Sequence, residues 1–238
     1  MPIQEPRLED IPASSLRHVG QEVQRIEDVG LVTGRVEFID NVKVHDMLHC
    51  AMLHSSQAHA RIRAIDTSRA EALPGVVAII TGADAKRWSL PSGGFPEGTG
   101  AWCMAIEKVH YVGEPVAAVA AVSRAVAEDA LELIDIDYEP LPPVVDSRKA
   151  MEPGSPLVIE SLGTNVALQR QFVWGEVDAA FASADRVFKE SFRWNRVGAN
   201  PMETFGCICQ WDEVEQTVTI RGSVQAPRLT ALASAGVL

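Results

Sequence analysis

The first residues that could carry chemistry are the four cysteines, and two of them, Cys207 and Cys209, stand one residue apart. On a β-strand both sulfurs would face the same side of the sheet. A metal role would need two more soft ligands nearby, and the neighbouring sequence holds no paired Cys-x-x-Cys motif. Cys50 and Cys103 are distant in the sequence. We therefore predict that the cysteines pack as small apolar side chains and hold no metal.

Three of the six histidines, His49, His54 and His59, follow one another at intervals of five residues. This spacing matches neither one face of a helix nor one face of a strand. We therefore expect surface or hydrogen-bonded loop histidines in place of a metal site. The glycine-rich stretches 92–94 and 98–100 lack the spacing of the phosphate-binding loops, so we predict no nucleotide site there either.

The overall composition narrows the classes of function. The 238 residues carry a net charge of −11, and without a run of Lys or Arg such a chain is a poor binder of nucleic acid or of an anionic membrane. The longest apolar run, 115–122, is far shorter than the roughly 20 residues that span a membrane. We predict a cytoplasmic protein with no membrane span.

The first two thirds of the chain predict an α+β domain that ends near residue 146. A polar tail at residues 1–17 precedes it, followed by a helical start at 25–29 and a strand at 36–39. A buried strand at 116–122 precedes Ser123, which can cap a following helix. Strands are predicted at 47–53, 61–66, 76–81, 116–122 and 134–138, and helices at 68–73 and 124–133.

A long irregular loop interrupts this domain at residues 86–106. It contains the aromatic residues Trp88, Phe95 and Trp102 between glycines and prolines. Aromatic side chains on loops are favoured at protein interfaces. The loop is therefore a candidate docking surface, and structural packing of the tryptophans is the equally good alternative.

A second region of the chain follows a proline-rich linker. Residues 169–174 and 186–197 have the alternating pattern of strands, with a short helix at 178–184 between them. Two more strands are predicted at 205–211 and 217–224, joined through residues 212–216. A helix begins near residue 229, and its apolar residues Leu229, Leu232 and Val237 have nothing left to cover in the sequence that follows.

Eight short phrases, taken together, point to a family. In chain order they are RIEDVGLVTG (25–34), AHARI (58–62), ALPGV (72–76), VGEPVAAV (112–119), AEDA (127–130), DYEPLP (137–142), NPMET (200–204) and SVQAP (223–227). In this order and spacing the chain resembles the N-terminal part of the molybdenum-binding large subunit of the xanthine dehydrogenase/aldehyde oxidase/aerobic carbon monoxide dehydrogenase family. The resemblance runs from about residue 17 to residue 238.

The resemblance implies a fold and a division into domains. Residues 1–29 form a tail and lead-in, residues 30–146 an α/β hammerhead domain, and residues 147–164 a linker. Residues 165–238 form the beginning of a molybdenum-cofactor-binding domain. The break at the proline linker, found from composition alone, agrees with this division.

The resemblance also implies an oxidoreductase, part of a molybdenum hydroxylase. Such an enzyme hydroxylates a carbon of an aldehyde or an N-heteroaromatic compound with oxygen derived from water. The implied cofactor is molybdenum-molybdopterin, in its cytosine dinucleotide form, with FAD and 2Fe-2S clusters on partner subunits. The family's catalytic glutamate matches no residue of this chain, so we expect no activity from the chain alone. The alternatives are an inactive fragment and a subunit-docking module without catalysis.

One residue of the candidate site is carried over from the family, Gln225. The resemblance implies that its side-chain amide lies beside the molybdenum and donates a hydrogen bond to one of the metal's oxygen ligands. A neutral amide can orient an oxygen without competing as a ligand. The alternative is a glutamine that caps a turn at the end of a strand.

Glu203, in the NPMET phrase, is predicted to be structural and to bond the backbone. The chain also departs from the family at two places. Thr204-Phe205-Gly206 stands where an arginine is frequent, which puts any cofactor contact of that arginine in doubt. Arg228 stands where a histidine is frequent, so the polarity beside Gln225 differs.

Overall fold

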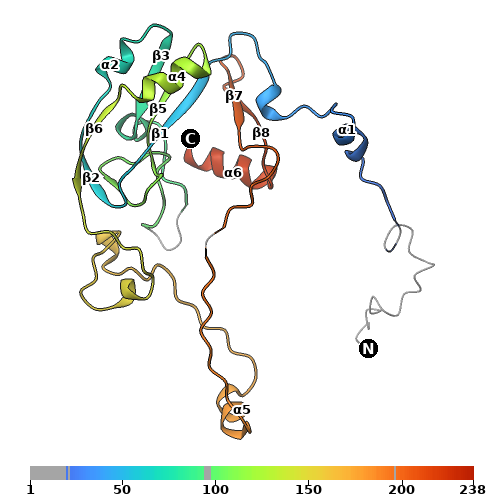
Figure 1. The fold of residues 1–238 in the computed structure, drawn as a ribbon, viewed down its shortest axis with the longest axis vertical. Helices are drawn as coiled ribbons and strands as arrows, with labels where there is room; N and C mark the ends of the chain where they lie inside the picture. Colours follow the sequence, from blue (N-terminus) through green and yellow to red (C-terminus); the bar gives the residue numbers. More distant parts are fainter. Residues whose placement is uncertain (1–19, 21, 94–97, 196) are drawn as a thin grey trace. The chain divides into compact units, whose positions relative to one another are not determined.

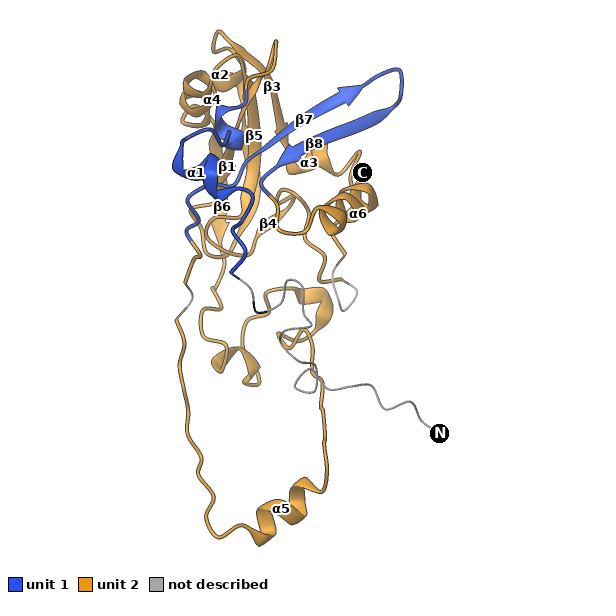
Figure 2. Ribbon diagram, turned by 90° about the vertical axis from the view of Figure 1, so that its right-hand side faces the viewer, with its two compact units in different colours: residues 1–42, 200–223 blue, residues 43–199, 224–238 orange. Residues whose placement is uncertain are grey.

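The computed structural model describes residue 20 and residues 22–93, 98–195 and 197–238. The chain divides into two compact units, coloured separately in Figure 2. One combines residues 1–42 with 200–223, and the other combines 43–199 with 224–238. Most of the predicted polar tail lies outside the described residues.

The larger unit is built on two three-stranded antiparallel sheets, seen with their helices in Figure 1. The first has the order β1-β5-β3 and the second the order β4-β2-β6. The strands are β1 (His49–His54), β2 (Ala60–Asp66), β3 (Val76–Thr81), β4 (Lys108–Val109), β5 (Pro115–Ala121) and β6 (Asp135–Pro140). The helices between them are α2 (Ser68–Glu71), α3 (Gly82–Ala85) and α4 (Arg124–Leu131).

The central strand of the first sheet, β5, explains the apolar run in the sequence. It pairs with β1 on one side and β3 on the other, for example Val119 with Ala51 and with Ile79. Val116 and Val119 are fully buried. A strand covered on both faces can keep small apolar residues at every position, which is the pattern of PVAAVAA.

Helix α4 packs on β1 and β5 and closes the main core. The Ser123 hydroxyl accepts a hydrogen bond from the Val126 backbone N–H at 3.3 Å, so the predicted cap is confirmed. Ala127 and Ala130 are buried on the side of the helix that meets the sheet. Small residues at these positions allow the helix to approach the sheet closely.

Gly82 sets how closely α3 approaches the loop before β4. A Cβ atom added to Gly82 would lie 2.1 Å from the carbonyl oxygen of Ala105, which is backbone and cannot rotate away. The preceding Thr81 donates from its backbone N–H and its hydroxyl to the Asp84 carboxylate at 3.0 and 2.8 Å. These bonds hold the pKa of Asp84 below its usual value. Helix α3 is thus a short helix that Thr81 and Asp84 cap.

The smaller unit contains the β7–β8 hairpin (Cys207–Asp212 and Thr217–Gly222) and helix α1 (Asp28–Val32). The strand predicted at 36–39 is wrong, because this stretch runs into a 3₁₀ helix at Ile39–Asn41. Helix α1 lies three residues later in the chain than the predicted helical start at 25–29.

Two other predicted strands, at 169–174 and 186–197, are also wrong. Only helix α5 (Val177–Ser183) forms between residues 166 and 202, where every described residue is exposed. A strand needs a neighbour for its backbone hydrogen bonds, and the alternating pattern alone does not supply one. The remaining predicted strands and helices exist within two to three residues of their predicted bounds, and the α+β fold is confirmed.

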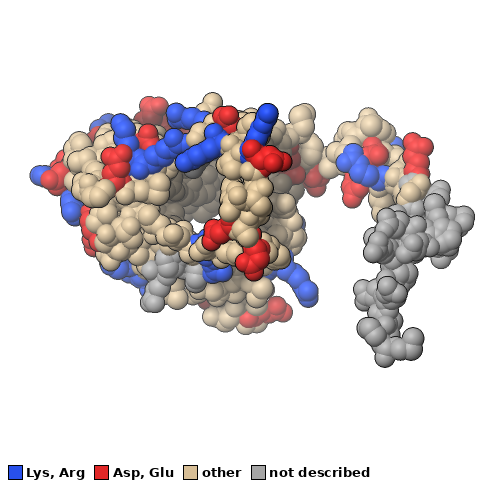
Figure 3. Space-filling model, turned by 90° about the horizontal axis from the view of Figure 1, so that it is seen from below, with Lys and Arg blue, Asp and Glu red and all other residues tan. Residues whose placement is uncertain are grey.

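The prediction of packed cysteines is wrong, since all four are exposed. Cys207 and Cys209 lie on the exposed side of a hairpin strand, whose two faces are not both covered. Acidic and basic side chains are intermixed on the face that Figure 3 shows. Among the described helices, none is both long enough and apolar enough to cross a membrane.

Candidate functional site

Gln225 lies at a bend between the end of β8 and the start of α6 (Pro227–Val237). It is exposed, and its side-chain amide makes no hydrogen bond to any described residue. The alternative role as a turn-capping glutamine therefore has no hydrogen bond to support it. An amide held at a bend with both its donors and its acceptor open can bind an external polar group.

Helix α6 begins directly after this glutamine. Pro227 occupies its first turn, where the missing N–H costs nothing, and no side chain caps the helix. The Thr230 N–H and hydroxyl both bond the Ala226 carbonyl, at 2.9 and 3.1 Å. No side chain bonds the backbone N–H groups in the first turn of α6, where the exposed Arg228 lies. This end of the helix therefore favours a negatively charged group nearby.

The apolar side of α6 is only partly covered. Leu229 and Leu232 are 68% and 70% exposed, which confirms the prediction for these two residues. Val237 is half-buried instead, and its carbonyl accepts a hydrogen bond from the Leu90 N–H at 2.7 Å. The far end of the helix is thereby bonded to the loop that follows α3.

Glu203 behaves as predicted. Its carboxylate accepts a hydrogen bond from the Ile39 backbone N–H at 3.0 Å within the smaller unit. Beside it, a Cβ on Gly206 would come within 3.0 Å of the Ile39 side chain, so this glycine permits the close approach. Phe205, where the family often carries an arginine nearby, is 81% exposed. Glu203 thus holds two distant chain segments together.

The described histidines His59 and His110 each contact one other group of the chain. His59 is 5% exposed and its Nδ1 lies 2.8 Å from the Pro142 carbonyl, while its Nε2 is buried without a partner among the described residues. His110 Nδ1 lies 3.1 Å from the Glu114 carboxylate. Within the described residues no three His, Cys, Asp or Glu side chains gather in a metal-binding group.

The aromatic loop 86–106 only partly matches its predicted role as a docking surface. Trp88 is 48% exposed, Trp102 is half-buried, and Phe95 lies outside the described residues. Ser92 donates from its N–H and its hydroxyl to the Ala101 carbonyl, at 2.9 and 3.0 Å, and so joins two positions of the loop that are nine residues apart.

Residues 147–164, predicted as a linker, are held in place by hydrogen bonds. The Lys108 side chain is 10% exposed, and its ammonium lies 2.6 Å from the Glu160 carboxylate and 2.7 Å from the Val158 carbonyl. The Asn165 amide donates to the Ala150 and Pro156 carbonyls and accepts from the Val158 N–H. The hydrogen bond from Lys108 is the main reason that the pKa of Glu160 lies below its usual value.

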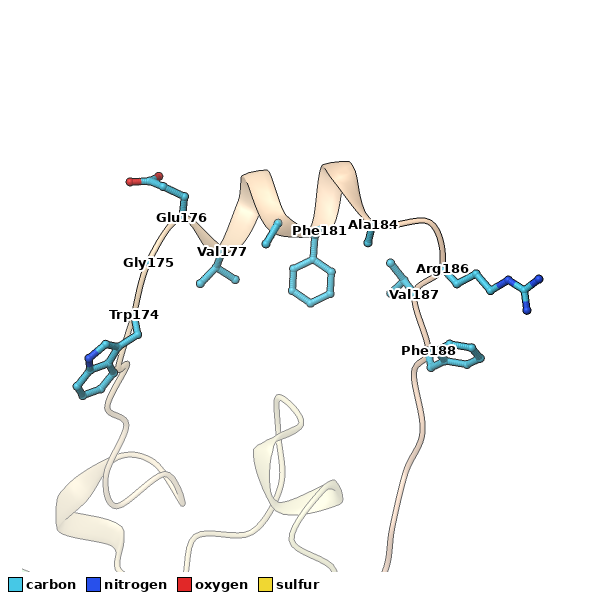
Figure 4. A pocket seen from close by; sticks show the side chains of 10 residues that line it. Trp174, Gly175, Glu176, Val177, Phe181, Ala184, Arg186, Val187 and Phe188 are labelled. Carbon is cyan, nitrogen blue, oxygen red and sulfur yellow. The ribbon is translucent and has the colours of Figure 1, made fainter. Parts of the chain in front are cut away.

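A hollow around α5 was missed by the sequence prediction. It has a volume of about 550 Å³ and lies on the inner side of the bend in Figure 4. Val177 and Phe181 point into it from the helix, and Trp174 and Val187 come from the two chain segments that flank the helix. The alternation of large apolar residues on both sides of 178–184 was the available signal.

Comparison with known proteins matches two successive parts of the chain to two domain families. The family described as aldehyde oxidase and xanthine dehydrogenase, a/b hammerhead domain, matches residues 33–142. The molybdopterin cofactor-binding domain family matches residues 159–238.

Individual relatives agree with these matches. The carbon monoxide dehydrogenase large chain of Afipia carboxidovorans is 40% identical over 230 residues, which cover 91% of this chain and 28% of that one. The nicotine 6-hydroxylase large subunit of Paenarthrobacter nicotinovorans is 37% identical over 88% of this chain and 26% of its own length. The crystal structure of quinoline 2-oxidoreductase from Pseudomonas putida 86 superposes with a TM-score of 0.80 at 36% identity, covering 91% of this chain and 28% of that one. The chain therefore spans between a quarter and a third of the length of these relatives.

Proposed function

The chain belongs to the aldehyde oxidase and xanthine dehydrogenase family, and we propose that it works as part of the large subunit of a molybdenum hydroxylase. The proposed reaction hydroxylates a carbon of an aldehyde or an N-heteroaromatic compound with oxygen derived from water. What supports it most is the match of residues 159–238 to the molybdopterin cofactor-binding domain, in which Gln225 stands with an open amide. The proposed domains are 30–146 for the hammerhead and 165–238 for the beginning of the cofactor domain.

The residues present fit such a cofactor on the evidence of their own chemistry. The Gln225 amide is exposed and unbonded within the described part of the chain, and α6 starts beside it without a capping side chain. A molybdopterin carries oxygen and phosphate groups, which accept hydrogen bonds from an amide and from open backbone N–H groups. When bound, the cofactor supplies the two-electron redox chemistry that side chains lack.

The role proposed for Gln225 is to donate a hydrogen bond to an oxygen of the cofactor and so to orient it. An amide does this without changing charge, so it does not compete for protons. Arg228 adds a positive charge in the first turn of the helix, where the family often has a histidine. We expect this charge to favour the anionic form of a bound group over a wider pH range than a histidine would.

The remaining parts of the proposal concern the complete enzyme. We propose the cytosine dinucleotide form of the pterin, and partner subunits that carry FAD and 2Fe-2S clusters and remove the electrons. The catalytic base would come from the part of the large subunit that matches no residue of this chain. The chain alone would then be inactive, and the complete complex would be cytoplasmic.

The experiment that tests the proposal is purification of the chain from cells that make the molybdenum cofactor, together with the polypeptides encoded beside it. Molybdenum is measured by mass spectrometry and the pterin by its fluorescence after oxidation. We expect both in near-equimolar amount to the complex. Gln225→Ala should leave the complex assembled and lower its turnover roughly a hundredfold, the scale for loss of a well-placed hydrogen-bond donor.

Gln216→Ala serves as the matched control, because Gln216 lies in the β7–β8 turn with a left-handed backbone and is exposed. This variant should keep full turnover. A complete complex that contains neither molybdenum nor pterin would contradict the proposed function.

A further inference from the structure

The stretch of the chain from α4 to the end of β6 carries charges of one sign. Between Arg124 and Arg148 it contains seven acidic side chains and no Lys or Arg. Its strand β6 is also an edge strand, because the sheet has the order β4-β2-β6. We propose that β6 is a docking edge, to which an extended segment of another protein adds as a further strand, with Lys or Arg at alternate positions. The proposal does not depend on the cofactor, because β6 lies within residues 33–142, the match to the hammerhead family.

The ladder between β2 and β6 determines which backbone groups of β6 face outward. The Leu141 N–H bonds the His59 carbonyl at 2.9 Å, and bonded and unbonded pairs alternate along an antiparallel ladder. The Ile62 N–H bonds the Glu107 carbonyl at 2.8 Å, although Ile62 stands opposite Tyr138 on β6. The pair of Ile62 and Tyr138 is therefore an unbonded one, and the N–H and C=O of Tyr138 point away from β2.

Ile136 faces the same way, because it stands two residues before Tyr138 on the same strand. Within the described part of the chain, no third strand pairs with β6 on this side, and neither residue has a backbone hydrogen bond to a turn or loop. An edge with open N–H and C=O groups is a template for pairing with another strand. The two residues thus offer two donors and two acceptors to an added strand.

The exposed face of β6 selects the charge of the added strand. Ile136 and Tyr138 pack against a core cluster, so Asp135, Asp137 and Glu139, which alternate with them, lie on the opposite face. Side chains on the same face of neighbouring strands interact, and opposite charges stabilise the pair whereas like charges destabilise it. A strand with Lys or Arg at alternate positions would place its basic side chains beside this acidic row.

Part of the acidic row is already paired within the larger unit. Asp135 lies 3.3 Å from Arg69, and Glu139 lies 3.4 Å from Arg63. Asp137, between them, is exposed and has no ion pair with a described residue. Its cross-strand neighbour on β2 is an alanine, which carries no charge. Asp137 is thus the carboxylate of the row that is open to a basic side chain of the partner.

The same charges argue against a second copy of this chain as the occupant. Two β6 strands side by side would bring carboxylates together on one face, which destabilises a strand pair. The net charge of −11 adds repulsion between whole chains. Charged side chains on an open edge are a known protection against pairing with other copies, and a basic strand is the partner that this protection attracts.

The test uses the full chain and a synthetic peptide of six residues, the length of β6, in which Lys alternates with Val or Thr. Titration calorimetry measures the dissociation constant, and hydrogen exchange detected by NMR follows the amides of Ile136 and Tyr138. We expect the peptide to bind and to slow the exchange of both amides roughly tenfold or more at saturation, because each gains a strand hydrogen bond.

Two control peptides separate strand pairing from simple charge attraction. A peptide with Glu in place of each Lys should not bind. A peptide that keeps each Lys but carries N-methyl groups on the backbone nitrogens that face β6 should bind roughly tenfold more weakly, because it lacks the donors of an added strand.

Two variants of the chain locate the contact. Asp137→Lys should weaken binding of the Lys peptide roughly tenfold, because it places like charges side by side. Glu152→Lys makes the same change of charge at an exposed position outside β6, and it should alter binding less than about twofold.

Four results would overturn the proposal. They are no binding of the Lys peptide, equal binding of the Lys and Glu peptides, equal binding of the N-methylated peptide, and binding that leaves the exchange of Ile136 and Tyr138 unchanged. Protection of both amides in the chain before any peptide is added would mean that the edge is already closed, and would overturn it as well. The molybdenum content of the complex tests the proposed function separately.

Discussion

Two neighbouring segments of the larger unit reverse what their sequences predict. Residues 147–164 are predicted as a linker, yet Lys108 and Asn165 hold them with five hydrogen bonds to three backbone carbonyls, one backbone N–H and a carboxylate. Residues 166–199 look like two strands around a helix, yet every described residue of this segment is exposed.

The difference lies in where the partners of each segment are. Asn165 bonds the Ala150 and Pro156 carbonyls, which are within fifteen residues of it. The partners of a strand are distant in sequence, and a strand without them cannot satisfy its backbone groups by itself. Residues 147–164 thus receive polar partners from Asn165 and from Lys108, whereas the described part of the chain pairs no strand with 186–195.

The largest effect on stability is expected in the packed core of the larger unit, which lies outside both segments. Gly82→Ala places a Cβ against the Ala105 carbonyl oxygen, which neither a side-chain rotation nor a small shift can clear. We expect the free energy of unfolding to fall by about 3 kcal/mol, the upper range for overpacking. Chemical denaturation followed by fluorescence measures it.

The control for this variant is Gly93→Ala, because a Cβ there meets nothing within 4 Å. Its unfolding midpoint should stay within the experimental error of the wild type. Equal losses in the two variants would mean that the α3 approach is looser than described.

A smaller effect is expected in the bonded segment. Lys108→Met keeps the apolar stem but removes the donor to Glu160 and to the Val158 carbonyl. Loss of these bonds should cost about 1–2 kcal/mol and raise the exchange of backbone amides in 150–165 roughly tenfold. Hydrogen exchange with mass spectrometry detects this, and the exposed Lys86→Met should show no change.

The same contact predicts a pH dependence. The pKa of Glu160 is lowered in the folded chain, so the contact contributes stability above the ordinary pKa of 4.5 and loses it as the pH falls through the lower, folded value. Because Glu160 is more than half exposed, the effect is small. The protection of the amides in 150–165, relative to their intrinsic exchange rate at each pH, should fall as the pH is lowered below 4.5, and Glu160→Gln should remove this fall while the protection of β5 stays unchanged.

The smallest effect belongs to the exposed segment. Phe192→Ser with Trp194→Ser removes side chains that are almost fully exposed, so the free energy of unfolding of the isolated chain should change by less than about 0.5 kcal/mol. Thermal denaturation of the purified chain tests this. A loss as large as that of Gly82→Ala would mean that these aromatic side chains already pack within the chain.

The sequence predicts the helices and strands that are determined by interactions between residues close in sequence. The apolar run of β5 and the Ser123 cap of α4 are visible in the letters, and so are the ends of β2 and β3. The backbone bond of Glu203 was predicted as a type of contact, but its partner Ile39 lies 164 residues away and could not be named. The site residue Gln225 rests on family phrases, and no local rule distinguishes it from another turn residue.

Other features depend on distant contacts and have no sequence signature. The need for glycine at position 82 comes from the Ala105 backbone, 23 residues later. Two of the five hydrogen bonds that hold residues 147–164 come from Lys108 on β4, about 50 residues earlier in the chain. The exposed cysteines show the same limit, because the burial of a small apolar residue depends on what covers its strand.

Hydrogen exchange of the full chain tests the contrast between the two segments most directly. We expect slow exchange in β5 and in 147–164. Residues 186–195 should exchange without protection, because the described part of the chain pairs no strand with them. Protection of 186–195, or none in 147–164, would contradict the account.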